Sequence, residues 1–350
     1  PLGLAWLPGG LGVPASASDV GAIAWGPLAA SLAVGASAGV LAVIVGAALA
    51  AAFEMTDLPG RALWATAALL PFVCPSTVWA LGQVYCFAGG GLMERWCPQP
   101  WRTLCVLSDP RHYVATTLVL AQVHAPLAML IIGRGLRRLE HAGLQAAELS
   151  LSGWARIGWT AGAVRQEVAA AFLLVLALSL CNFGVPHVLQ CPLYCNEIYV
   201  RVANYLDHAG ALRAALPLLA VAVGAAAAIA WTERKRGYVL SETAQRAAPI
   251  RLRGGGLLLG GFAAGYLVLT SVLPVVAMIA ECKSPGHLLQ VAADAAAEAE
   301  NTIWIGLAAA LTACLAGVVV GSWVGRCRRL GIDAVTIAPL GIPALVLGLA

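Results

Sequence analysis

The sequence predicts an all-α integral membrane protein, a polytopic bundle of about eight transmembrane helices. Of its 350 residues 60% are hydrophobic and only 11% are charged, and the mean hydropathy is +0.83. A soluble domain needs more charge than this to cover its surface. The charged residues also cluster, and the uncharged runs between the clusters reach the roughly 20 residues that a helix needs to cross a bilayer. Both observations indicate repeated membrane crossings.

Eight runs without Lys, Arg, Asp or Glu are the predicted crossings: Val20–Phe53, Ala62–Met93, Val114–Gly133, Val168–Asn196, Ala214–Thr232, Gly254–Ala280, Asn301–Gly325 and Ala334–Ala350. The first run carries Ser31, Gly35 and Gly39 at steps of four, a small-residue stripe that lets another helix approach closely. The second contains Pro71 and Pro75, which a helix bundle tolerates because neighbouring helices satisfy the freed backbone groups.

The basic residues predict which way the chain faces. Fifteen of the 21 Lys and Arg residues fall in the loops 54–61, 233–253 and 326–333 and in the segment between the third and fourth crossings. The other six fall in the alternate loops. By the positive-inside rule the richer side is cytoplasmic. A net charge of +4 with this spread gives no reason to expect nucleic acid as a partner.

A polar segment between the third and fourth crossings, Gly133–Gly162, is too long for a tight turn. Small and apolar residues recur in it at helical spacing from about Leu136 to Leu151, opposite polar residues such as Glu140 and Glu148. The pattern predicts a short cytoplasmic helix that a partner outside the membrane holds.

A second informative stretch, Cys181–Val202, is uncharged until Glu197 and is interrupted by glycine and prolines. It is too irregular for one straight helix in lipid, so it lines a cavity or lies on the outer face. Its cysteines and His187 invite a metal-site interpretation, but their spacing matches no zinc motif. A disulfide or incidental thiols are favoured instead, and no metal or cofactor is expected.

The order of elements suggests an internal duplication. A small-residue helix, a short basic turn and a helix with two prolines four apart occur twice, ending in Pro71 and Pro75 and again in Pro339 and Pro343. We therefore expect three parts. Residues 1–232 are a first permease repeat lacking its first helix, 233–253 a cytoplasmic linker, and 254–350 a second, truncated repeat. The chain is expected to be a fragment cut at both ends.

The segments AAELSLSGWARIGW, NFGVP and NEIYVRV together resemble the transmembrane permease subunit of bacterial binding-protein-dependent ABC importers. The likeness covers nearly the whole chain and is greatest to the fused, two-fold permeases for ferric iron and their relatives for thiamine, polyamines and phosphonates. In that family the cytoplasmic segment begins Glu-Ala-Ala and docks on the ATPase subunit. Here Gln145, Ala146 and Ala147 stand at that position, and Gly153 follows where the family has a slightly earlier glycine.

The resemblance implies two sets of site residues. The first would dock on the ATPase: Leu139, Gln145, Ala146, Ala147, Glu148, Leu151 and Gly153. The second would lie on the pathway or the outer face: Asn182, Phe183, Gly184, Glu197 and Tyr199. The resemblance further implies that the protein lies in the bacterial inner membrane, where lipid surrounds it. Its partners would be a dimeric ATP-binding subunit and a periplasmic or lipoprotein substrate-binding protein.

The expected function is thus a non-enzymatic transport subunit, most consistent with ferric iron uptake. Neither of the two lysines follows the GxxxxG of a phosphate-cradling loop, so ATP hydrolysis belongs to another chain. The chain also lacks HExxH and GxSxG, which argues against a membrane hydrolase. The alternatives are a permease for thiamine, polyamine or phosphonate, an inverted-repeat secondary transporter and a membrane scaffold. A secondary transporter predicts charged residues in mid-membrane, and the eight runs contain none.

Overall fold

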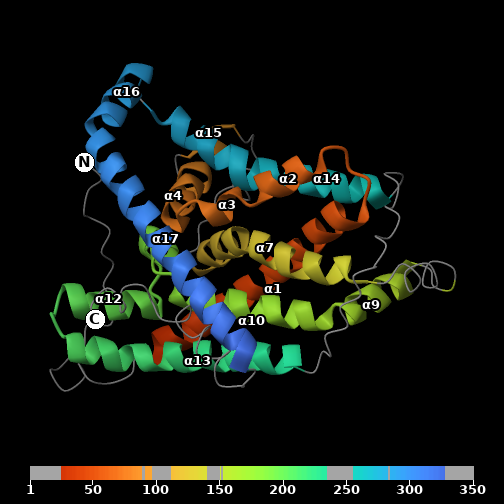
Figure 1. Cartoon of the computed structure of the whole chain (residues 1–350). Helices are drawn as coiled ribbons and strands as arrows, with labels where there is room; N and C mark the ends of the chain where they lie inside the picture. Colours follow the sequence, from red (N-terminus) through yellow and green to blue (C-terminus); the bar gives the residue numbers. More distant parts are fainter. Residues whose placement is uncertain are drawn as a thin grey trace.

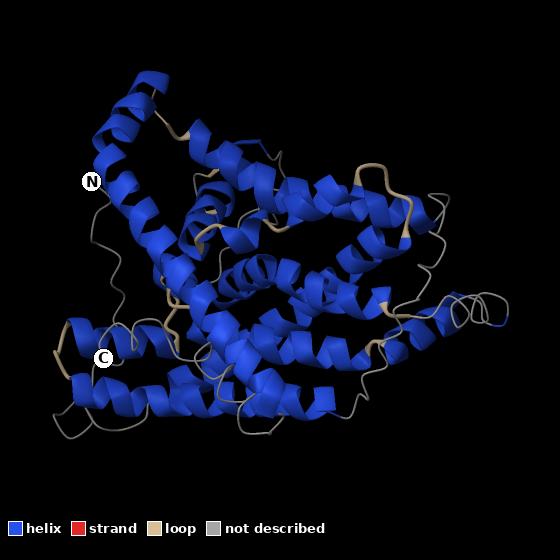
Figure 2. Cartoon of the chain, viewed as in Figure 1, coloured by secondary structure: helices blue, strands red, loops and turns tan. Residues whose placement is uncertain are grey.

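The structure, a computed structural model, describes residues 25–88, 91–96, 112–139, 150, 153–234, 255–282 and 284–327. Of these residues 88% are helical, and none of them lies in a β-strand (Figure 2). The predicted all-α class is confirmed.

The N-terminal part, the described residues before 235, contains α1 (Trp25–Met55), α2 (Arg61–Ala68), α3 (Leu70–Val73), α4 (Ser76–Phe87), α5 (Leu92–Trp96), α7 (Tyr113–Arg137), α9 (Gly153–Ala163), α10 (Arg165–Cys181), α11 (Gly184–Val188), α12 (Tyr194–Ala203) and α13 (His208–Arg234). The C-terminal part, the described residues after 254, contains α14 (Gly255–Leu267), the π-helix η2 (Val268–Val272), α15 (Leu273–Ala280), α16 (Pro285–Asp294) and α17 (Ala296–Cys327).

Within the described residues five helices are long and apolar enough to cross a membrane: Trp25–Met55, Tyr113–Arg137, His208–Ile229, Leu257–Ala280 and Ala296–Val319. Two bent pairs bring the number to seven if each pair is one span. The prediction of eight crossings is therefore met in part, and the eighth, Ala334–Ala350, lies outside the described residues.

The predicted crossing Ala62–Met93 is broken rather than straight. Its two halves, which meet between Val73 and Ser76, are bent by 96°. Cys74 precedes Pro75 and has an extended backbone, with ψ at 150°. The Pro75 ring disfavours helical geometry at the preceding residue, so the helix ends there and α4 starts afresh.

Helix α1 runs through the centre of the bundle, with α7 beside it, α10 and α13 on one side, and α2 and α14 on the other (Figure 1). The small-residue stripe predicted on α1 performs the expected role. A Cβ at Gly39 would meet the Phe172 ring of α10 at 3.1 Å, and one at Gly35 would meet Leu176 at 3.2 Å. The Ser31 hydroxyl accepts a hydrogen bond of 2.8 Å from the backbone N–H of Tyr194.

The approach of α1 to α7 is closer still. A Cβ at Gly46 would lie 2.8 Å from the backbone oxygen of Ala125 and 2.7 Å from the Cβ of Ala128. Only glycine fits such a backbone contact. Together α1 and α7 contribute most of the apolar core, including the fully buried Leu49 and Leu120.

The C-terminal part packs on the N-terminal part through α14, η2 and α15. A Cβ at Gly82 of α4 would lie 2.8 Å from the Cβ of Pro274 in α15, and buried Ala277 packs with Cys86 and Leu92. Helix α17 differs, since none of the residues in its apolar span is buried.

Candidate functional site

The segment predicted to dock on a partner leaves the bundle at the end of α7. Helix α7 continues past Gly133 to Arg137, with Arg134 and Arg137 in its last turn, where the helix dipole favours positive charge. Arg137 pairs with Glu54 near the end of α1, with 3.2 Å between Nη1 and Oε1. This ion pair fixes the exit of the polar segment against α1.

A buried carboxylate fixes the re-entry of the same segment. Glu167, in the first turn of α10, is only 3% exposed, and a Cβ at Gly135 would lie 2.7 Å from its carboxyl carbon. The carboxylate occupies the space that a Cβ at position 135 would take, so a larger residue there would displace the Glu167 side chain. The acidic residue also suits the positive end of the α10 dipole.

The structure describes few of the residues predicted to dock. Leu139 lies in the turn after α7, is half-buried, and packs against the apolar core of the bundle. Gly153 is the first residue of α9. The other five, Gln145, Ala146, Ala147, Glu148 and Leu151, lie outside the described residues, as does most of the helix predicted from Leu136 to Leu151.

Sequence reasoning missed two exposed apolar residues on α9, which projects from one end of the bundle (Figure 1). Ile157 is 58% exposed and Trp159 is 38% exposed. Helix α9 meets α10 at an angle of 67°. The apolar stripe and the family motif both point to positions before Leu151. Two large apolar residues within a polar segment are nevertheless a pattern that predicts a protein contact.

As predicted, the stretch Cys181–Val202 is not one straight helix: the chain breaks after Cys181 and continues as the short helices α11 and α12. Helix α10 ends at Cys181, so the uncharged run Val168–Asn196 is a single helix only as far as that residue. The Asn182 side chain explains the new start, because its Oδ1 accepts a hydrogen bond of 3.0 Å from the backbone N–H of Val185 in α11. Such side-chain acceptors compete with continued helix and favour a fresh helix start.

This break meets the break at Pro75. The Nδ2 group of Asn182 donates a hydrogen bond of 3.1 Å to the hydroxyl of Ser76, the first residue of α4. A Cβ at Gly184 would lie 2.5 Å from Cγ2 of Thr77. Asn182 and Gly184 therefore hold the end of α10 against the start of α4.

Phe183 and Tyr199 come together as the sequence grouped them. Their ring centroids are 4.7 Å apart, and His187 stacks on Phe183 at 4.8 Å. His187 thus belongs to an aromatic cluster. The described residues contain no group of three His, Cys, Asp or Glu side chains placed to hold a metal ion.

Two of the three cysteines in this region, Cys191 and Cys195, sit in the protein interior, and Cys181 is partly exposed. Cys191 is buried, and the thiol of Cys195 donates a hydrogen bond of 2.6 Å to the carbonyl of Leu180. Burial raises the pKa of the Cys195 thiol, and neighbouring Cys181 adds to that rise. Cys195 is therefore held as a neutral thiol.

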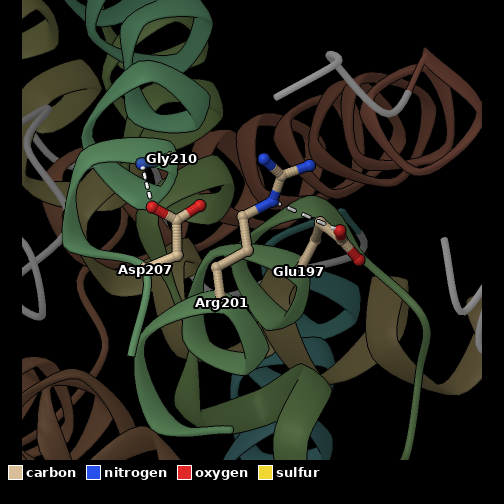
Figure 3. A network of polar contacts seen from close by, with 4 residues as sticks. All are labelled: Glu197, Arg201, Asp207 and Gly210. Carbon is tan, nitrogen blue, oxygen red and sulfur yellow. Dashed lines mark hydrogen bonds and ion pairs between the residues drawn. The ribbon is translucent and has the colours of Figure 1, made fainter. Parts of the chain in front are cut away.

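Glu197 of α12 pairs with Arg201, with 3.4 Å between Oε1 and Nε (Figure 3). The Arg201 side chain is only 7% exposed. The acid in the first turn and the base in the last turn both suit the dipole of α12. Asp207 then caps α13 by accepting a hydrogen bond of 2.8 Å from the N–H of Gly210 (Figure 3).

These features define a class: a polytopic helical protein in which the break at Pro75 contacts the chain just after the end of α10, and in which a polar segment is anchored between two apolar helices. Neither the protein-family models nor the curated proteins compared with the chain give a match.

Proposed function

We propose that this chain is the transmembrane permease subunit of a binding-protein-dependent ABC importer. It forms part of the translocation pathway, and a separate ATPase drives it. The observation that carries the proposal is the anchored polar segment between α7 and α10. The Arg137–Glu54 pair and the Gly135–Glu167 contact fix both of its ends, and α9 within it exposes Ile157 and Trp159. A partner that pushes on such a segment moves α7 and α10 with it.

The resemblance stated above supplies the details of the proposal. Asn182 to Gly184 and Glu197 to Tyr199 match the iron-type permeases, so ferric iron is the favoured substrate. Thiamine, polyamines and phosphonates are the alternatives. The partners are a dimeric ATP-binding subunit and a periplasmic or lipoprotein substrate-binding protein at the bacterial inner membrane, and the two parts of the chain are two permease repeats.

The test measures coupling to the ATPase. The full-length protein is reconstituted in proteoliposomes with an ATP-binding subunit that co-purifies with it, and ATP hydrolysis is recorded. The double variant Ala146→Glu, Ala147→Glu should lower the stimulated rate at least about tenfold, because each docked carboxylate would be buried without a partner. The matched control Ala292→Glu, Ala293→Glu places the same charges on exposed positions of α16 and should leave the rate unchanged.

Full stimulation in the Ala146→Glu, Ala147→Glu variant would refute docking at this segment. A secondary transporter is the second candidate, and the broken spans favour it because transporters of that class bind solutes at discontinuous helices. Solute uptake that needs an ion gradient and proceeds without ATP would establish that candidate instead.

A further inference from the structure

A cluster of polar side chains joins the N-terminal and C-terminal parts halfway along their helices. Gln122 lies near the middle of the span Tyr113–Arg137, and Tyr266 and Thr270 lie near the middle of Leu257–Ala280. Gln83, Tyr266 and Thr270 are each no more than 8% exposed. Polar groups at this depth need partners within the protein, because lipid offers none.

Two of the hydrogen bonds in this cluster replace bonds that prolines remove. A proline has no backbone N–H, so the carbonyl four residues earlier loses its helical donor. In α7 the proline is Pro126 and the freed carbonyl is that of Gln122, which accepts a hydrogen bond of 3.0 Å from the Tyr266 hydroxyl.

In α15 the proline is Pro274, and the freed carbonyl is that of Thr270. It accepts a hydrogen bond of 2.9 Å from Nε2 of Gln122. The backbone widens around this point into the π-helix η2, in which the N–H of Leu273 bonds the carbonyl of Val268. Such π-turns are frequent at functional sites. Each helix thus supplies the donor that a proline removed from the other.

Two further bonds hold the donors in position. Nε2 of Gln83 on α4 donates to Oε1 of Gln122 at 2.7 Å, which orients the Gln122 amide toward Thr270. The Thr270 hydroxyl donates to the carbonyl of Tyr266 at 2.7 Å. If the two parts separated, both freed carbonyls would lose their donors at the same time, as would Nε2 of Gln122 and the Tyr266 hydroxyl their acceptors, whereas the Gln83–Gln122 bond lies within the N-terminal part and would remain.

We propose that Gln122 and Tyr266 form a reciprocal latch that holds the N-terminal and C-terminal parts closed at mid-membrane. The latch opens when water or a polar solute takes over its hydrogen bonds, which exposes amides, a hydroxyl and two backbone carbonyls but no charged side chain. That the latch gates a transport pathway rests on the proposed permease function. The existence of the latch does not depend on that function, and its tests need neither ATPase nor transported solute.

The first experiment uses native cysteines as reporters in the full-length protein in proteoliposomes. Cys86 is fully buried in the contact between α4 and α15, whereas Cys195 is buried among helices of the N-terminal part alone. A membrane-impermeant methanethiosulfonate is added, and mass spectrometry follows modification of each thiol. Tyr266→Phe and Gln122→Leu should each speed modification of Cys86 about fivefold to tenfold, the effect of losing one hydrogen bond or slightly more.

Cys195 should stay unreactive in both variants, and Tyr113→Phe, a tyrosine outside the cluster, should leave both thiols unchanged. Equal acceleration of Cys86 and Cys195 would show general loosening and overturn the latch. An unchanged Cys86 rate in Tyr266→Phe and Gln122→Leu would overturn it as well.

The second experiment tests the reciprocity. Pro274→Ala returns a donor to the Thr270 carbonyl, so Gln122→Leu should lose most of its effect on Cys86 in that background. Pro126→Ala should likewise suppress the effect of Tyr266→Phe. The exchanged pairs, Pro274→Ala with Tyr266→Phe and Pro126→Ala with Gln122→Leu, should keep the full acceleration. Equal behaviour of all four pairs would refute the crosswise bonding.

Discussion

Glycines at close helix contacts are the residues with the least freedom to change. A Cβ at Gly46 would meet a backbone oxygen and a backbone nitrogen at 2.8 Å, whereas Gly224 in α13 has nothing within 4 Å. Gly46→Ala should lower the free energy of unfolding by about 1–3 kcal/mol through overpacking. Gly224→Ala should raise it by about 0.5–1 kcal/mol, because alanine is the better helix former. Equilibrium unfolding in mixed micelles measures both, and a Gly46→Ala protein as stable as the parent would contradict the α1–α7 contact.

The cap of α13 offers a second test at the scale of one residue. Asp207 accepts the N–H of Gly210, so Asp207→Ala should cost about 1 kcal/mol of unfolding free energy. Asp207→Asn keeps the accepting oxygen and should cost far less. If the two variants unfold at the same denaturant concentration, the cap contributes nothing measurable.

The sequence allowed some single-residue roles to be predicted and concealed others. The contacts of Gly35 and Gly39 were predictable because small residues at steps of four have a known use on membrane helices. The partner of Glu167 was not, because it depends on a glycine 32 positions earlier that only the fold brings near. The bonds of Gln122 were also hidden, since they need two prolines on different helices to face each other.

Helix α9 is the element whose exposure matters most for the proposed docking. Ile157→Asp should reduce stimulation of the partner ATPase at least about tenfold, because a docked isoleucine contributes roughly 1.5–3 kcal/mol of apolar burial. Val291→Asp on α16 is the matched control, since Val291 is 51% exposed, close to the 58% of Ile157, and lies outside the five apolar spans. Full stimulation in the Ile157→Asp protein would mean that α9 contacts something other than the ATPase.

The observed helix ends agree with the predicted ones where charged residues flank an apolar run. They differ where a proline or an asparagine side chain breaks a helix. Helices α1 and α7 end within a few residues of the predicted positions because charged residues stop the apolar runs there. The break at Pro75 was not predicted, because the residues on both sides of it are uncharged and read as one crossing. The stretch between the predicted crossings Gly254–Ala280 and Asn301–Gly325 contains α16 and the first turn of α17, where alanine and glutamate have high helix propensity.

For the whole molecule, the distribution of basic residues predicts which face lies in the cytoplasm. Cys282 follows α15 and should react with an impermeant thiol reagent added outside intact cells, whereas Cys327 at the end of α17 should react only after permeabilisation. Mass spectrometry of the two peptides reads the result. Labelling of Cys327 alone from outside would invert the topology.

Composition and the length of the uncharged runs were enough to predict the all-α class, because only helices or a closed barrel satisfy the backbone in a membrane and runs of about 20 residues fit helices rather than barrel strands. It did not predict which helices touch. Helix α17 reads like the other spans in sequence, yet no residue of its apolar span is buried, while two-thirds of the corresponding α7 window is. Whether a helix is buried depends on which other helices pack against it, and the sequence of that helix alone does not identify them.

The meeting of the two breaks has a mechanical consequence. Because Asn182 and Gly184 rest on Ser76 and Thr77, the end of α10 and the bend at Pro75 share one point of contact. A force applied to α10 from the polar segment would therefore act directly on the start of α4 through this contact. A displacement at the anchored end of α10 would in this way reach the bend of the other span at Pro75.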